Sequence, residues 1–116
     1  MILQTINDKL LEIDPNVFYG AVKNSMKETL WNYVVFNRTT KRQNENKTGY
    51  TEIYAVHIVR ENWLDEGLEE AVIKKVCEIA GMRMIGEGSY TYVMKPNTDT
   101  VIEMFSVEFA RPIKKV

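Results

Sequence analysis

The chain has 116 residues, of which 45% are apolar and 27% are charged, a composition typical of one globular domain and too hydrophobic for a disordered protein. Fifteen basic and sixteen acidic residues give a net charge of −1, which excludes a polycation held on nucleic acid or on an anionic membrane by its overall field. The single cysteine, Cys77, excludes an intramolecular disulfide, and no apolar run is long enough to span a bilayer.

The N-terminal part of the chain predicts one helix and an ambiguous apolar stretch. Apolar residues recur at helical spacing through residues 2–13, which indicates a short amphipathic helix. Asp14-Pro15 should end it, because a residue that precedes proline is driven out of the α region. The following VFYGAV (17–22) is compatible with a short strand or with an extended lead-in.

Two strands are predicted next, over WNYVVFN (31–37) and TEIYAVHIVR (51–60). Both are rich in β-branched and aromatic residues. In the second strand the side chains of Ile53, Ala55, His57 and Val59 alternate with those of Tyr54, Val56 and Ile58. Apolar residues thus point to both faces, and we expect this strand to be central and covered on both sides.

The two strands are separated by the polar stretch NRTTKRQNENKTGY (37–50). It is longer than the usual hairpin loop of about two to five residues, which favours a functional loop. Residues 39–49 contain no aliphatic or aromatic side chain that could offset an ordering cost of roughly 1–2 kcal/mol per residue. We therefore expect a long polar loop at 38–50, in which residues 39–49 form an arm that is mobile in a free subunit and becomes ordered on contact with a neighbouring subunit.

The second half of the chain predicts one helix and further strands. EGLEEAVIKKVCEIAG (66–81) has an apolar stripe, acidic residues near its start and Gly81 as the residue that ends it. MRMIGEGSYTYVMK (82–95) is either two strands or one strand with a bulge at Gly86 and Gly88. VIEMFSVEFARP (101–112) is a last strand that Pro112 should stop.

The resulting order, α-(β)-β-β-α-β-β over residues 1–116, predicts a single α+β domain. Hairpins separated by a helix favour a mostly antiparallel, mixed β-sheet with two helices packed on one face.

We find no constellation of residues that indicates catalysis, a cofactor or a metal ion. His57 has no recognisable nucleophile and acid around it, and Cys77 lacks metal-ligand spacing. The carboxylates of LDEGLEEA (64–71) lack EF-hand spacing and are explained by the helix dipole. The GEG at 86–88 lacks the length and the lysine of a phosphate-binding loop. We therefore expect a protein that is not an enzyme.

The basic residues indicate more about function than the candidate catalytic and metal-binding residues do. Four basic residues, with one aromatic residue, lie in the polar stretch 37–50: Arg38, Lys41, Arg42 and Lys47, with Tyr50. Three more lie at or after the end of the last strand: Arg111, Lys114 and Lys115. Such residues could follow phosphates, but the chain has no pattern of a known nucleic-acid-binding module. A solvated loop or an arm that contacts a neighbouring protein subunit is the preferred interpretation for Arg38, Lys41, Arg42, Lys47 and Tyr50.

The pattern as a whole resembles the tail terminator (tail completion) proteins of long-tailed bacteriophages of Gram-positive hosts. The resemblance is carried by five stretches that cover most of the chain: WNYVVFNR (31–38), YAVHIVREN (54–62), EGLEEAVIKKV (66–76), GMRMIGEGSYTY (81–92) and KPNTDTVIEMFSVEFARP (95–112). These are patterns of strand, loop and helix, without a catalytic signature.

This resemblance implies a virion structural protein, assembled in the host cytoplasm, that forms a hexameric ring in the tail neck. The ring would cap the tail tube, end tube polymerisation and offer a surface for joining the head. Its implied partners are other copies of itself, the major tail tube protein and the head-tail connector or neck proteins, with genomic DNA passing through the lumen without sequence-specific binding. The alternatives are another neck component, either a head completion or a connector adaptor protein, and a small phage nucleic-acid-binding protein.

Overall fold

The computed structural model describes residues 1–23, 29–45 and 48–114. Two helices and five strands follow one another along the chain in the predicted order, and VFYGAV contributes a strand; the elements are α1 (Ile2–Leu11), β1 (Val17–Tyr19), β2 (Tyr33–Gln43), β3 (Gly49–Glu61), α2 (Leu68–Cys77), β4 (Arg83–Met94) and β5 (Val101–Lys114). Neither helix is long and apolar enough to cross a membrane, within the described residues.

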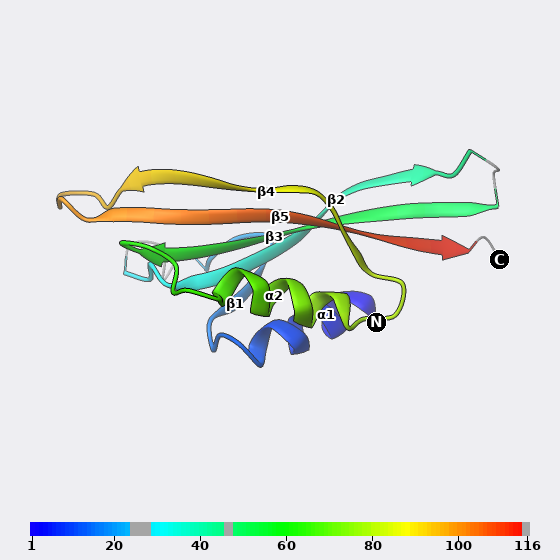
Figure 1. Ribbon diagram of the computed structural model, residues 1–116, viewed down its shortest axis with the longest axis horizontal. Coiled ribbons are helices and arrows are strands. Elements are labelled where there is room, and N and C mark those ends of the chain that lie inside the picture. Colours follow the sequence, from blue (N-terminus) through cyan, green and yellow to red (C-terminus); the bar gives the residue numbers. More distant parts are fainter. Residues whose placement is uncertain (24–28, 46–47, 115–116) are drawn as a thin grey trace.

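The strands form one mixed sheet in the order β1-β2-β3-β5-β4. β1 runs parallel to β2, whereas all other neighbours are antiparallel. Both helices pack against the same face of this sheet (Figure 1). The prediction of a single α+β domain with two helices on one face is therefore confirmed.

The core lies between the helices and the middle of the sheet. The buried side chains of Tyr54, Val56 and Ile58 on β3 meet those of α1 and α2, as their alternation along the strand requires. Beyond the end of α1, the carboxylate of Asp14 accepts a 2.5 Å hydrogen bond from the Arg60 guanidinium of β3 and a 2.7 Å bond from the Asn16 N–H. This ion pair anchors the segment that leads from α1 to β1.

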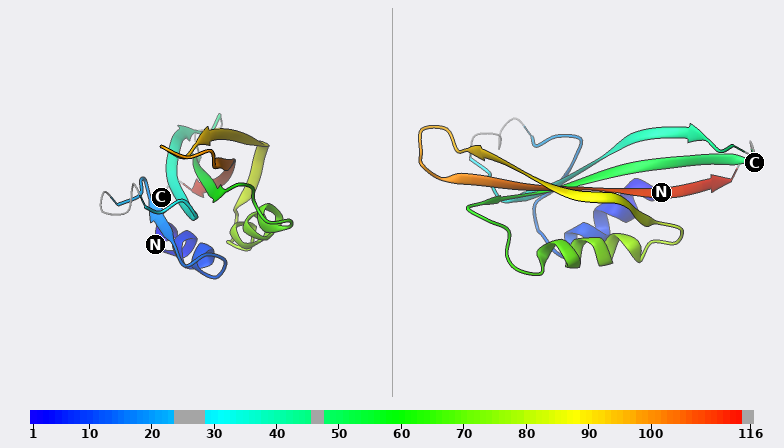
Figure 2. Two further views of the ribbon diagram at one scale, coloured as in Figure 1. Left: turned by 90° about the vertical axis from the view of Figure 1, so that its left-hand side faces the viewer. Right: turned by 45° about the horizontal axis from the view of Figure 1, so that its top comes forward.

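The molecule is elongated, with extents of 52 × 28 × 24 Å. The helices cover only part of its length, and the β2–β3 hairpin and the end of β5 extend beyond them (Figures 1 and 2). The face of β3 that points away from the helices nevertheless buries Ile53, Ala55 and Val59.

The predicted polar loop at 38–50 is wrong over most of its length. β2 continues to Gln43, which is in register with Tyr50 of β3, so that Arg38, Lys41 and Arg42 are strand residues. Sequence reasoning judged this stretch by its lack of apolar side chains, whereas the ordering cost is offset by backbone hydrogen bonding to β3. The expectation that residues 39–49 are mobile in a free subunit fails for Thr39–Gln43, which pair within one chain.

The ends of β5 and α2 also differ from the predicted ends. The strand β5 passes through Pro112, because β4 pairs with β5 only as far as Ala110 and the missing proline N–H faces an unpaired side. The helix α2 ends at Cys77 rather than near Gly81, and tight turns follow it. Of the two alternatives for residues 82–95, the structure has one strand with a bulge at Gly86 and Gly88, since the register of β4 against β5 shifts between Ile85 and Ser89.

The bulge generates a prediction about Gly88. A Cβ atom at this position would lie 2.2 Å from Cζ of Phe105, whose ring is buried and packs against Tyr90. We expect Gly88→Ala to lower the free energy of unfolding by about 1–3 kcal/mol through overpacking. In a Phe105→Leu background the same change should cost less, and costs that simply add in a urea-unfolding double-mutant cycle would contradict this contact.

Candidate functional site

Several stretches of the sheet keep one side without a neighbouring strand in the described parts of the chain, among them β1 and the end of β5 beyond Ala110. Two further stretches are longer than these. β1 pairs only with Val34–Phe36, so the outer side of β2 from Asn37 to Gln43 is unpaired; we call this stretch the β2 edge. At the opposite side of the sheet, β4 pairs with β5 alone. Its regular part beyond the bulge, Ser89–Met94, is called the β4 edge.

The β2 edge carries the basic residues singled out from the sequence. Lys41 lies over the ring of Tyr50, 5.2 Å from its centroid, in a cation–π contact. Arg38 donates a 3.1 Å hydrogen bond from Nε to the hydroxyl of Tyr19 on β1. The structure thus brings Lys41 and Tyr50 together and aims Arg38 at β1, while the prediction for Lys47 lies outside the described residues.

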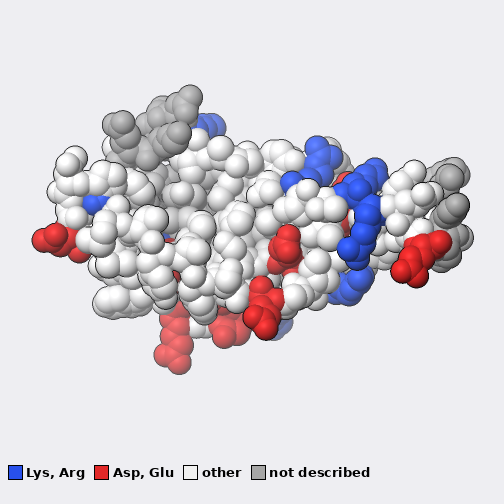
Figure 3. Space-filling model, turned by 90° about the horizontal axis from the view of Figure 1, so that it is seen from above, with Lys and Arg blue, Asp and Glu red and all other residues white. Residues whose placement is uncertain are grey.

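The end of β5 adds further basic residues to this region. Arg111 lies opposite Glu52 and Lys114 opposite Gly49 in the β3–β5 ladder. Seen from above, Lys and Arg side chains gather over the part of the molecule where the β2–β3 hairpin extends (Figure 3). Within the described residues, Arg38, Lys41 and Arg42 have no carboxylate within ion-pair distance. Their positive charge is therefore available to a partner.

A buried carboxylate lies beneath this basic region. Glu52 is buried and accepts a hydrogen bond from the hydroxyl of Tyr54. Burial and this hydrogen bond raise the pKa of Tyr54 to about 12. Glu52 is thus hydrogen-bonded within the subunit, and it forms no ion pair with Lys41 or Arg42 among the described residues.

The β4 edge is apolar where the β2 edge is basic, and the sequence analysis did not predict it as a site. Tyr92 and Val93 are 59% and 60% exposed, and Tyr90, Met94 and the nearby Val101 are exposed as well. From Ser89 to Met94 the strand has no charged residue, which is unusual for an exposed edge. That absence is a signal in the sequence, but it becomes meaningful only when β4 is known to be the outermost strand.

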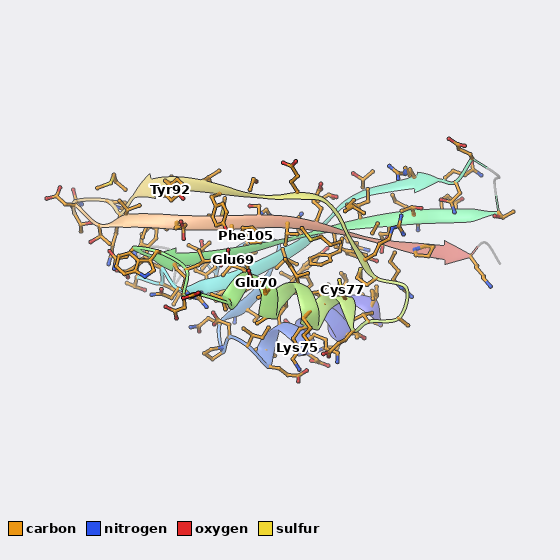
Figure 4. All side chains as sticks on the ribbon, in the orientation of Figure 1. Glu69, Glu70, Lys75, Cys77, Tyr92 and Phe105 are labelled. Carbon is orange, nitrogen blue, oxygen red and sulfur yellow. The ribbon has the colours of Figure 1, made fainter. Side chains whose placement is uncertain are left out.

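Two exposed tyrosines of β4 donate hydrogen bonds to carboxylates. The hydroxyl of Tyr90 donates to Glu69 of α2, and that of Tyr92 donates to Glu103 of β5 at 2.9 Å. These hydrogen bonds are the main reason why the pKa of Tyr90 rises to about 12 and that of Tyr92 is also raised. Figure 4 labels Tyr92 on β4 and Glu69 and Glu70 at the start of α2. The β4 edge is therefore apolar with an acidic border.

The two side chains considered for catalysis, His57 and Cys77, lie on different elements, β3 and α2. His57 lies half-buried on the face away from the helices, with Nδ1 2.7 Å from the hydroxyl oxygen of Ser106. Cys77 is exposed. Over residues 1–23, 29–45 and 48–114, no group of three or more His, Cys, Asp or Glu side chains could hold a metal ion.

A small apolar hollow lies on the helix-free face, bordered by Trp31, Val59 and Met104 among others. Its volume of about 140 Å³ is below the roughly 300–1,000 Å³ of typical small-molecule sites. The edges of the sheet are therefore better candidates for function than this hollow.

Comparisons with known proteins give no match to the sequence, but they do give a match to the fold. No protein-family model matches the sequence, and no curated protein matches it. Among solved structures, the chain is similar to a chain of the virion of a native gene transfer agent particle, with a TM-score of 0.53 and 12% identity. The match covers 98% of this chain and 92% of the other. The fold of a virion component is thus reproduced over nearly the whole length of both chains.

The environment of His57 generates a prediction about pH. Burial lowers the pKa of His57 below its ordinary value of 6.5, and the charge of Glu108 acts in the opposite direction. The folded protein therefore favours neutral His57, whose contribution to stability is present above pH 6.5 and is lost as the pH falls through the lowered pKa.

We expect the free energy of unfolding to fall more between pH 7 and pH 5 in the wild-type protein than in His57→Gln. Urea unfolding at a series of pH values measures this difference, and the other titrating groups cancel between the two proteins. Parallel pH profiles for the two proteins would show that burial does not perturb His57.

Proposed function

We propose that this protein is a structural protein of a phage-like virion that assembles into a hexameric ring in the tail neck. The ring caps the tail tube, ends tube polymerisation and provides the head-tail joining surface. Its partners are other copies of the chain, the major tail tube protein and the connector or neck proteins, and DNA passes through its lumen. The chain acts without a cofactor and without catalytic turnover.

The observation that carries this proposal is the likeness of fold to a chain of a gene transfer agent virion, over 98% of this chain and 92% of the other. The two sheet edges support it independently. One edge is basic and the other is apolar with an acidic border, and they lie on opposite sides of the same sheet. Surfaces of this kind suit a subunit that joins to its own copies.

Deletion of the gene for this protein tests the proposed role. We expect deletion of the gene in the phage or particle that encodes it to give tail tubes longer than normal and without heads, because nothing ends tube growth. Electron microscopy of lysates measures tube length and head attachment, and expression of the protein from a plasmid should restore both.

The alternatives give different particles in the same experiment. Tails of normal length beside full heads would place the protein among the other neck components. Normal virions, with a defect only in events that involve nucleic acid, would contradict a structural role.

A further inference from the structure

We propose that the β2 edge of one copy pairs with the β4 edge of the next, so that the sheet continues from subunit to subunit. The inference rests on the proposed function and specifies the contact that would close the ring. Its occupant is a second copy of this chain, and its contact is heterologous, because two different surfaces meet. Contacts of that type generate rings when the rotation between copies closes.

The strand directions of the sheet favour this continuation. β2 and β5 run one way, whereas β3 and β4 run the other, as the antiparallel pairs require. When a second copy is placed beside the first without inversion, its β2 therefore lies antiparallel to β4. The pairing thus repeats the antiparallel geometry that β2, β3, β5 and β4 already have within one chain.

The two edges lie at different heights along the strands. Thr40, at the centre of the β2 edge, is level with Ile53 and through it with Ala110, whereas Thr91 of the β4 edge is level with Met104. The six residues from Ala110 to Met104 correspond to about 20 Å, and the repeat of four strands is about 19 Å wide. Neighbouring copies would therefore be shifted along the strand direction by a distance about equal to the width of the four strands of one copy.

That stagger corresponds to strands tilted by about 45° from the ring axis, which is the upper end of the tilt of closed sheets. The offset of the two edges is therefore compatible with closure into a ring and does not force an open filament.

The charges of the two edges are complementary on the same face. Lys41 lies opposite Glu52 on the helix side of the sheet, and Tyr90 lies opposite Phe105 on that side with its hydroxyl on Glu69. With the helices of both copies on one side, Lys41 of one copy approaches the carboxylate of Glu69 in the next. Glu87, exposed at the bulge, lies toward the tip of the neighbouring hairpin.

The same charges explain why the edges would not pair indiscriminately. Lysine and arginine on a free edge disfavour pairing with another copy of that same edge, since like charges would face each other. An apolar edge bordered by carboxylates accepts them instead. The pattern therefore selects the contact between unlike edges over the contact between like edges.

Charge reversal on each edge tests this contact. A basic-edge variant carries Lys41→Glu with Arg42→Glu, and an acidic-edge variant carries Glu69→Lys with Glu87→Lys. Each alone should weaken self-association on the order of 100-fold, because like charges then meet at the contact. Size-exclusion chromatography with light scattering measures assembly of the purified full chain, and circular dichroism melting shows that each variant is folded.

Recombination of the reversed edges makes the test specific. An equimolar mixture of the two variants should assemble into rings with alternating copies, and a chain that carries all four changes should assemble by itself. Lys74→Glu with Asp8→Lys reverses two exposed charges on the helices without changing the net charge, and this control for charge reversal away from the edges should leave rings intact.

The outcomes separate this contact from the proposed function. Rings formed by either edge variant alone, or a mixture that stops at dimers, would overturn the contact while leaving a ring-forming protein. A wild-type chain that forms no ring would overturn the proposed function, and the contact with it.

Discussion

The pairing of β3 with β5 is the constraint on which the rest of the structure depends. It runs without a register shift from Gly49–Lys114 to Glu61–Ile102, along nearly the full length of the molecule. The helices and the core cover the middle of this ladder, and β2 and β4 attach to its two sides. Because the ladder is longer than its cover, the protein must extend a polar hairpin beyond its own core.

The extended hairpin is held by backbone pairing and by local side-chain contacts. Thr39 donates a 3.2 Å hydrogen bond to the carbonyl of Ile53, and Thr51 donates one of 2.7 Å to the side chain of Asn44. Gly49 sits where a Cβ atom would lie 2.3 Å from the carbonyl oxygen of Ile113, so that β5 can approach closely. Such contacts order the hairpin within one chain and leave its outer side open to a partner.

The parts of the fold that depend on periodicity could be predicted from the sequence. The alternation through Ile53–Val59 predicted a central strand, and the glycines at 86 and 88 narrowed residues 82–95 to two strands with a turn or one strand with a bulge. The hairpin from Arg38 to Tyr50 could not be predicted, because polar composition reports exposure to water and an exposed strand has the same composition as a loop.

The β4 edge could not be predicted for a different reason. Tyr90, Tyr92 and Val93 become an exposed edge only because β5 inserts between β3 and β4, an order that a single sequence does not encode in any local pattern. The basic residues of the candidate site could be named in advance, but their apolar and acidic counterpart depended on topology. Assembly through unlike edges is thus an inference that needs the sheet order.

Hydrogen–deuterium exchange on the assembled and dispersed protein tests the central claim, assembly through these edges, most directly. The account predicts that amides within residues 37–43 and 89–94 whose N–H groups point outward exchange more slowly in the ring. The amides of β3, and those of β5 where it lies between β3 and β4, should change little, because neighbouring strands already flank them within one subunit. Equal exchange at both edges in the two states, with protection elsewhere on the surface, would contradict the account.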